Sequence, residues 1–173
     1  MKEVYIVLTS TGTALSNIII KYKHAEYGHV SISLDKELDL LYSFGRIHPY
    51  NAFCGRLVHE GIHFGTFKRF KDTKCKIYRL TVDEEQHQLM KSKIEEMLNR
   101  RPKYKFNIRG LFLAAFNRRI PRNNHFYCSE FVRYILEKGN VDVTNLPSVV
   151  QPDDMRKIKG LKLIYEGLLR DYN

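Results

Sequence analysis

One segment of the sequence alternates strictly between polar and apolar side chains, His29-Val30-Ser31-Ile32-Ser33-Leu34. A period of two residues predicts a β-strand that is buried on one face only. The three apolar side chains would then pack in a core, and His29, Ser31 and Ser33 would line the opposite face. The next residues, Asp35-Lys36-Glu37, are typical of a turn, so this strand is expected to lead into a second one.

The second strand is predicted over Leu38–Gly45, with every other residue apolar. The apolar residues of this face are Leu38, Leu40, Tyr42 and Phe44. If the two strands form a hairpin that buries both apolar sets on one side, the register is restricted to pairings such as Val30 with Tyr42. The same registers put His29 and Ser43 together on the polar face, and one register sets them directly opposite each other.

A downstream cysteine precedes an apolar stripe with helical spacing. The stripe consists of Phe131, Val132, Ile135 and Leu136. Glu137-Lys138-Gly139 predicts the end of the helix. Cys128 would lie in the first turn, where backbone N–H groups are unpaired and the helix dipole is positive. That location lowers a thiol pKa and supplies donors for an oxyanion. The alternative is a small core residue at a helix start.

The other apolar segments predict further strands and helices. Strands are expected at Val4–Leu8, near Gly55–His59, His63–Phe67 and Cys75–Leu80, and at Leu161–Tyr165. Helices are expected from Ala14 to about Tyr22, from an Asp83 N-cap closed by Gln86 to about Arg100, from an Asn107 N-cap to Pro121, and after Gln151-Pro152-Asp153-Asp154. The order of strand, helix, β-meander and helices predicts an α+β fold. No repeat or linker is present, so we expect a single domain over residues 1–173.

Composition narrows the class of protein. A length of 173 residues and a hydrophobic fraction of 43% suffice for one domain with a full core. No apolar run is long enough to span a membrane, and the N-terminus lacks the pattern of a signal peptide. The three cysteines, Cys54, Cys75 and Cys128, have no CxxC spacing. We therefore expect a reducing, cytoplasmic environment, without disulfides, a metal site or another cofactor.

The net charge of +10 is large for this length. Cations are dense at Lys68–Lys71, Arg100–Lys105 and Arg118–Arg122. Such a surface attracts polyanions, which include nucleic acid, anionic lipid headgroups and acidic cell-wall polymer. The alternative is a set of solvated basic faces with no specific partner. A nucleic-acid-binding protein is the least favoured class, because the sequence has no helix-turn-helix, zinc or RNA-recognition signature.

Three residues have the chemistry of a cysteine hydrolase. Such an enzyme needs a thiolate, an imidazole that takes and returns a proton, and a polar group that fixes the imidazole. The sequence offers Cys128 at a helix start, His29 on the polar face of a strand, and Ser43 on the same face of the next strand. On local grounds His29 could equally be a surface strand residue. A hydroxyl is also a weaker orienting group than a carboxylate, an amide or a second imidazole.

Three segments together resemble a known family of cysteine hydrolases: Gly28–Leu34 (GHVSISL), Leu41–Arg46 (LYSFGR) and Phe126–Val132 (FYCSEFV). The chain is similar to the circularly permuted branch of the NlpC papain-like superfamily, and more narrowly to its YiiX-like group of bacterial proteins. In that branch the histidine strand precedes the cysteine helix, as it does here, whereas ordinary papain-like enzymes have the reverse order. The resemblance extends from Val4 to Met155 and includes the turn Gln151–Asp154. It implies a permuted papain-like (NlpC-type) fold, in which an antiparallel sheet or small barrel packs against helices and the nucleophile begins a helix.

The resemblance also implies catalytic roles for particular residues. Cys128 would be the nucleophile and His29 the general base. The third polar residue of the superfamily is best matched by Ser43, where a His, Asn, Gln or Glu would be more typical. Asp35 and Glu37 are alternatives for that role, although they fall in the predicted turn.

Other residues near these segments are candidates for substrate binding. Tyr127 and Ser129 flank the nucleophile and are expected to shape the site. Arg46 follows the second strand and could hold an anionic group of the substrate, or form a surface salt bridge instead. Glu130 is expected to be a partner of the helix dipole rather than an acid catalyst.

The expected function is that of a cysteine hydrolase or acyltransferase that works through an acyl-enzyme intermediate. Its substrate would be a peptide, another amide, or an acyl lipid, and would carry a negative charge if the basic surface takes part. The alternative is a catalytically weak or inactive papain-like domain that binds an anionic ligand or lipid. The sequence does not determine the oligomeric state.

Overall fold

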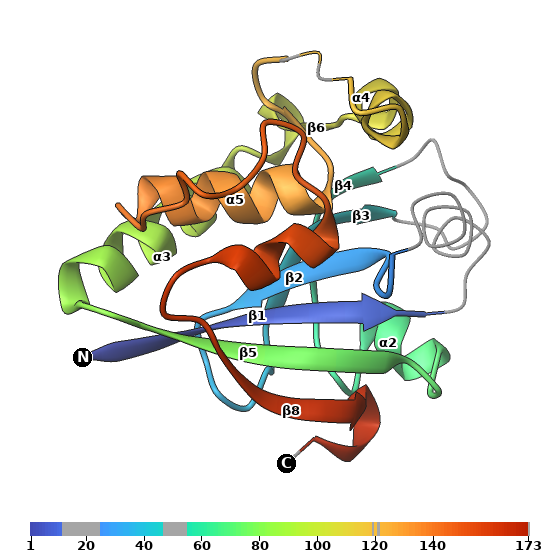
Figure 1. Ribbon diagram of the computed structural model, residues 1–173, viewed down its shortest axis with the longest axis vertical. Coiled ribbons are helices and arrows are strands. Elements are labelled where there is room, and N and C mark those ends of the chain that lie inside the picture. The colour runs from blue at the N-terminus through green and yellow to red at the C-terminus, as the bar shows by residue number, and fades with distance from the viewer. Residues whose placement is uncertain (12–24, 47–54, 119, 121, 173) are drawn as a thin grey trace.

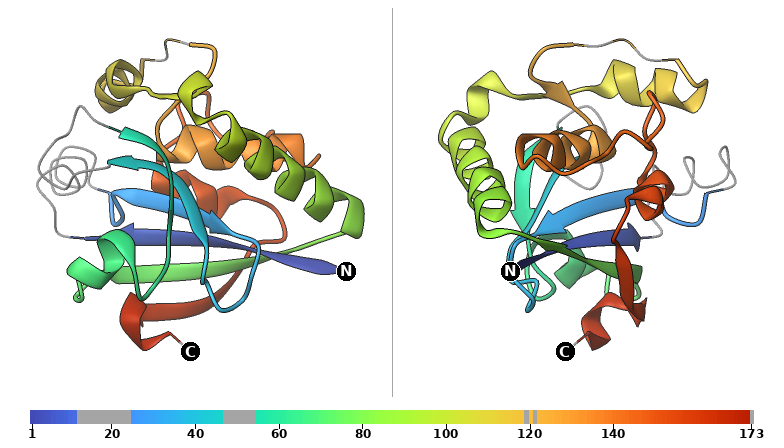
Figure 2. Two further views of the ribbon diagram at one scale, coloured as in Figure 1. Left: turned by 180° about the vertical axis from the view of Figure 1, so that it is seen from behind. Right: turned by 60° about the vertical axis from the view of Figure 1, so that its left-hand side comes forward.

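The computed structural model describes residues 1–11, 25–46, 55–118, 120 and 122–172, apart from the side chains of Arg46 and Ala115. Within these residues the fold is α+β, and a six-stranded antiparallel sheet has the order β4-β3-β2-β1-β5-β8 (Figure 1). Helices lie on both faces of this sheet (Figure 2).

The strands of the sheet are β1 (Lys2–Ser10), β2 (His29–Ser33), β3 (Leu41–Arg46), β4 (Gly55–Glu60), β5 (Lys74–Val82) and β8 (Lys162–Leu168). A short parallel pair joins β6 (Lys105–Phe106) to β7 (His125–Phe126). The α-helices are α2 (Gly65–Arg69), α3 (Glu84–Asn99), α4 (Ile108–Ala115) and α5 (Cys128–Lys138). The 3₁₀ helices are η1 (Arg101–Lys103), η2 (Pro152–Lys157) and η3 (Leu169–Asp171). Among the described residues, none of these helices combines the length and the apolar character that crossing a membrane requires.

Strand β1 is buried on both faces, so the sheet has a core on each side. Val4, Ile6 and Leu8 pack with residues of α3 and α5 in the larger core. Tyr5 and Val7 face the smaller core, to which α2 and η3 contribute Phe67 and Leu169. Figure 2 shows α3 and α5 together on one face of the sheet. This two-sided burial explains the continuous apolar run in the first strand, because alternation is expected only where one face meets water.

Most of the predicted elements are confirmed. The strands expected at Val4–Leu8, Gly55–His59, Cys75–Leu80 and Leu161–Tyr165 are β1, β4, β5 and β8. Asp83 caps α3, and its side chain accepts a hydrogen bond from the Gln86 N–H at 2.7 Å while the Gln86 side chain accepts one from the Asp83 N–H at 3.1 Å. Asn107 caps α4 and accepts from the Gly110 N–H at 3.0 Å. The helix expected at Ala14–Tyr22 lies outside the described residues.

The strand predicted at His63–Phe67 is wrong, because the chain there forms α2. Gly65 has a φ of +70°, which a strand does not allow. The buried carboxylate of Glu60 also accepts a hydrogen bond from the Thr66 N–H at 3.0 Å, which satisfies a donor at the helix start. A glycine turn and a side-chain acceptor therefore favour a helix in this segment.

The second strand of the predicted hairpin is shorter than expected. It begins at Leu41 rather than Leu38, which adopts a left-handed conformation with φ 55° and packs in the smaller core. Leu40 is exposed, so these two leucines do not continue the face formed by Tyr42 and Phe44. Tyr42 pairs with Ile32 rather than with Val30, which shifts the register by two residues but keeps the side chains of the paired segments of β2 and β3 on their predicted faces.

Residues of η2 fix the chain that enters β2. The backbone N–H of Glu26 donates to the Asp153 carboxylate at 2.7 Å, and Arg156 donates to Glu26 at 2.7 Å and to Asp153 at 2.9 Å. Lys76 adds a further ion pair to Glu26 at 3.0 Å. Burial disfavours the charged form of Glu26, but Lys76 and Arg156 outweigh it, so the pKa of this carboxyl is lowered. Glu26 lies three residues before His29, so this ion-pair network orders the start of the predicted catalytic strand.

Replacement of Gly139 by Ala should destabilise the protein by about 1–3 kcal/mol, the usual cost of overpacking a core. A Cβ at Gly139 would lie 2.4 Å from Cγ of Met90, where α3 packs on α5. Its φ of −86° suits alanine, so backbone entropy alone would favour the substitution. Urea unfolding of Gly139→Ala would measure the loss, with Lys91→Ala on the exposed side of α3 as the control. A gain in stability would show that α3 and α5 are not in such close contact.

Candidate active site

The helix expected to carry the nucleophile begins at the predicted residue. Tyr127 is the N-cap of α5, and its carbonyl accepts the first helical hydrogen bond from the Phe131 N–H at 3.0 Å. The Glu130 carboxylate accepts the Tyr127 N–H at 3.3 Å and the side-chain amide of Asn107 at 3.1 Å. Glu130 therefore takes part in the N-terminal cap of α5, as expected for a residue in the first turn. The backbone N–H groups of Cys128 and Ser129 point out of the helix at its positive end.

Aromatic packing holds α5 on the sheet. The Phe44 ring of β3 lies 5.5 Å from Phe131 of α5 and 5.4 Å from Phe126. Val132 and Ile135 extend the same contact along the helix, and both are buried. Such ring spacings are typical of favourable tilted aromatic pairs. This packing sets the first turn of α5 against the beginning of β2.

The sulfur of Cys128 contacts β2 at the residue after His29. The backbone N–H groups of Val30 and Ser129 lie near the thiol, where they favour its thiolate form. The Cys128 side chain is nearly enclosed, with 6% of its surface exposed, and it forms part of the larger core.

Burial raises the pKa of the Cys128 thiol above its usual value. The N–H donors of Val30 and Ser129 lower it, but they do not offset the loss of hydration. The N–H groups of the helix start lower this pKa, as expected, but burial outweighs them and the net direction is upward. Burial thus favours the protonated thiol.

The predicted base and its orienting partner lie in hydrogen-bond contact. Nε2 of His29 lies 3.2 Å from the hydroxyl oxygen of Ser43. Ser31 adds a second hydroxyl at 3.4 Å from the same nitrogen, a neighbour that the sequence analysis placed on this face without assigning a role to it. Extending the observed register puts His29 opposite Gly45, and a Cβ at Gly45 would lie 3.9 Å from Cε1 of the imidazole. The imidazole thus lies over a glycine and between two buried hydroxyls.

The thiol and the imidazole approach the same strand end from different sides. Val30 points into the core beneath α5, and alternation directs His29 to the opposite face together with Ser31 and Ser43. The sulfur reaches the backbone of β2 one residue beyond His29. Since β2 begins at His29, both groups lie near the same end of this strand, on opposite faces of it.

Tyr127 and Ser129, the neighbours of Cys128 in sequence, form hydrogen bonds within the protein. The hydroxyls of Tyr127 and Ser129 both donate to the carbonyl of Val150, at 3.3 and 3.0 Å, and both side chains are buried. These bonds tie the chain before η2 to the start of α5. A substrate contact by either residue stays a prediction. Arg46 ends β3, paired with Gly55, and its side chain lies outside the described part of the structure.

The alternative orienting carboxylates lie at the other end of β2. Asp35 accepts hydrogen bonds from the Ser33 hydroxyl at 3.0 Å and the Asp39 N–H at 2.9 Å, which is the behaviour of a turn residue. Glu37 is exposed in the same turn. His29 begins the strand and Ser33 ends it, so the turn that contains both acids lies at the end of β2 remote from the imidazole.

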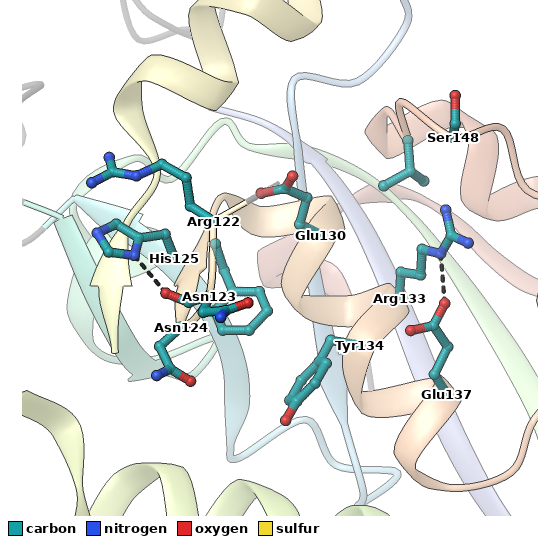
Figure 3. A pocket seen from close by; sticks show the side chains of 11 residues that line it. Arg122, Asn123, Asn124, His125, Glu130, Arg133, Tyr134, Glu137 and Ser148 are labelled. Atoms are coloured by element: carbon teal, nitrogen blue, oxygen red, sulfur yellow. Dashed lines mark hydrogen bonds and ion pairs between the residues drawn. The ribbon is translucent and has the colours of Figure 1, made fainter. Parts of the chain in front are cut away.

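A hollow of about 440 Å³ lies along the outer side of α5 (Figure 3). In Figure 3 Glu130, Arg133, Tyr134 and Glu137 project from the helix along one wall, and the segment Arg122–His125 forms the other. Arg133 is bound to Glu137 at 2.7 Å and to the Pro147 carbonyl at 3.0 Å. Cys128, His29 and Ser43 do not line this hollow.

Within the described residues, no three His, Cys, Asp or Glu side chains gather closely enough to bind a metal ion. Comparison of the chain with protein-family models, with curated proteins and with solved structures gives no match.

The rate of Cys128 alkylation by iodoacetamide should rise with pH and reach its midpoint above about 8.5, the pKa of a free cysteine. The reason is that burial favours the protonated thiol. Peptide-resolved mass spectrometry would separate Cys128 from Cys54 and Cys75, and the same protein in denaturant provides the reference midpoint. A midpoint well below that reference would mean that the thiolate is already formed in the resting protein.

Proposed function

We propose that this chain is a cysteine hydrolase or acyltransferase with a circularly permuted papain-like arrangement. The observation that supports the proposal most is the hydrogen bond between His29 and Ser43, at 3.2 Å, on the strand whose next residue, Val30, lies near the Cys128 thiol. These groups come from three separate segments and each has the type that acyl transfer requires.

In the proposed mechanism the imidazole acts through Nδ1, because Nε2 is directed at Ser43. With Nε2–H donating to the Ser43 hydroxyl, Nδ1 is the basic nitrogen and takes the proton of Cys128 as the sulfur attacks the substrate carbonyl. The N–H of Cys128 stabilises the oxyanion at the positive end of α5. His29 returns the proton to the leaving amine, alcohol or thiol, and water or another acceptor releases the acyl group from the sulfur.

The class of substrate is inferred from the charge of the chain. An acyl donor that carries a negative charge suits a net charge of +10. Peptides, isopeptides and acyl lipids that meet this condition are the substrates to screen. We place the activity in a reducing compartment, the cytoplasm, because Cys75 and Cys128 are free thiols buried in the structure.

A second function is favoured by the enclosure of the thiol. A Cys128 that is 6% exposed and has a raised pKa also suits a catalytically inactive domain that retains the papain-like arrangement and binds an anionic ligand. In that case the cysteine would be a small core residue at a helix start. The two functions differ in whether Cys128 forms an acyl-enzyme.

Replacement of Cys128 by Ala should abolish covalent labelling by a thiol-directed acyl probe, because no other side chain would supply the nucleophile. His29→Ala should slow labelling by about 10²–10⁴-fold, the usual contribution of a general base. Labelling would be measured by intact mass. Unchanged labelling of Cys128→Ala, or labelling at Cys54 or Cys75, would contradict the proposal.

Replacement of Ser43 by Ala should slow acylation by about tenfold, which corresponds to the loss of one hydrogen bond to the imidazole. The matched control is Ser33→Ala, since Ser33 lies on the same face of β2 but bonds to Asp35. The pH dependence of the rate would show whether the change acts through His29. Equal effects of the two substitutions would indicate a general loss of stability rather than an orienting role for Ser43.

A further inference from the structure

Helix α4 and the residues after it expose large apolar side chains. Phe112 is 58% exposed, Phe116 is 62% exposed and Ile120 is 52% exposed. Arg109, Phe112 and Phe116 recur at a spacing of three and four residues, so they share one side of the helix. Figures 1 and 2 show α4 at one end of the molecule, away from the sheet. Exposed apolar groups that cluster in this way mark an interaction surface more often than isolated ones do.

The opposite side of α4 is attached firmly to the start of α5. Ala114 is buried against Tyr127 and Val149. Its carbonyl accepts a hydrogen bond from the Gln151 side chain at 3.2 Å. The Asn107 cap donates to Glu130 of α5 at 3.1 Å. The helix therefore has a well-packed inner side, and the exposure of its outer side is not a sign of loose attachment.

The outer side also contains a shallow apolar hollow with cations at its rim. Its volume is about 440 Å³, and its lining residues are Arg109, Gly110, Phe112, Leu113, Ile120 and Arg122. The α4 surface consists of Arg109, Phe112, Leu113, Phe116, Ile120 and Arg122. The lining of the hollow therefore combines aromatic and aliphatic side chains with two arginines.

The charged side chains in the segment that contains α4 are all basic. The sequence between Glu96 and Glu130 contains eight Lys or Arg residues and no Asp or Glu. They are Arg100, Arg101, Lys103, Lys105, Arg109, Arg118, Arg119 and Arg122. A partner that covers the α4 surface must therefore supply negative charge and also accept apolar side chains.

We propose that the α4 surface docks the protein on the surface of an anionic lipid membrane. Phe112 and Ile120 would enter the acyl boundary, and Arg109 and Arg122 would pair with lipid phosphates or carboxylates. A second copy of the chain fits less well, because it would bring like charges together with no acid to pair them. Nucleic acid would satisfy the arginines but would leave Ile120 and Leu113 without an apolar partner. Docking requires no thiol chemistry, so this inference is independent of the proposed function.

The test is sedimentation of the intact chain with phosphatidylcholine vesicles that contain or lack phosphatidylserine. We expect binding only to the phosphatidylserine vesicles, and weaker binding at high salt. The double variant Phe112→Ser, Ile120→Ser should lower the partition coefficient by at least about tenfold, because the apolar contact is lost. Arg109→Gln with Arg122→Gln should lower it by about fivefold for each arginine.

The controls use exposed residues of the same types elsewhere. Leu163→Ser with Ile164→Ser changes exposed apolar residues of β8, and Lys159→Gln with Lys162→Gln removes two exposed cations. Neither should alter binding, and Cys128→Ala should bind as the unchanged chain does. Unaltered binding of the Phe112 and Arg109 variants, or equal loss in the control variants, would overturn the proposal. Binding to single-stranded RNA but not to the vesicles would also overturn it and would identify a nucleic-acid surface.

Discussion

Helix α5 rests on strands β2 and β3 through the Phe131 ring, which lies 5.5 Å from Phe44 in the larger core. This contact determines the position of the first turn of α5, because a helix packed along one face of a sheet has little freedom to slide. Its first residue, Cys128, is thereby brought to the backbone N–H of Val30. Apolar packing thus brings together two residues, Val30 and Cys128, that are 98 positions apart in the sequence. This placement determines how deeply the thiol is buried and which N–H groups lie near it.

The start of α5 is also the point at which the helical layer is joined together. Glu130 accepts hydrogen bonds from the N-cap residues of two helices, Asn107 of α4 and Tyr127 of α5. The carbonyl of Val150 accepts two further bonds from the hydroxyls of Tyr127 and Ser129. An acceptor shared by two helix ends couples their positions, since moving either one leaves a buried polar group unsatisfied. The exposed side of α4 is therefore held in a fixed relation to Cys128.

The sequence predicted the features that depend on local periodicity. Alternation in β2 and β3 put His29 and Ser43 on one face, and helical spacing after Cys128 located the start of α5 correctly. The register was wrong by two residues because the alternation of apolar residues continues back to Leu38, while the chain itself turns there into a left-handed conformation. A shift of two residues preserves the face of the paired side chains, so the prediction that His29 and Ser43 share a face survived the error.

The direction of the thiol pKa could not be predicted in the same way. A helix start lowers a cysteine pKa when the sulfur meets water or a cation, and the sequence contains no measure of how deeply the turn is buried. In the structure Cys128 is enclosed by the packing of α5 on β2, and burial raises its pKa despite the N–H donors. Enclosure depends on residues distant in sequence, such as Val30 and Phe44, whose effect on the sulfur appears only once the sheet and the helix are assembled.

The surroundings of Cys128 favour its neutral thiol over a thiolate. The sulfur lies in a low-dielectric core, which penalises a thiolate, and the imidazole has hydroxyl partners, Ser43 and Ser31, in place of a carboxylate. A hydroxyl can accept the Nε2–H and fix the orientation of the ring, but it does not balance the positive charge of an imidazolium as an aspartate does. Charge separation between Cys128 and His29 would then occur only as the acyl group is attacked, when the negative charge passes from the sulfur to an oxyanion beside the N–H groups of α5. If Cys128 and His29 act as we propose, they need a reactive acyl donor, such as an activated ester or thioester, more than a pair with a preformed thiolate does, because the cost of removing the thiol proton is added to the barrier of the attack itself.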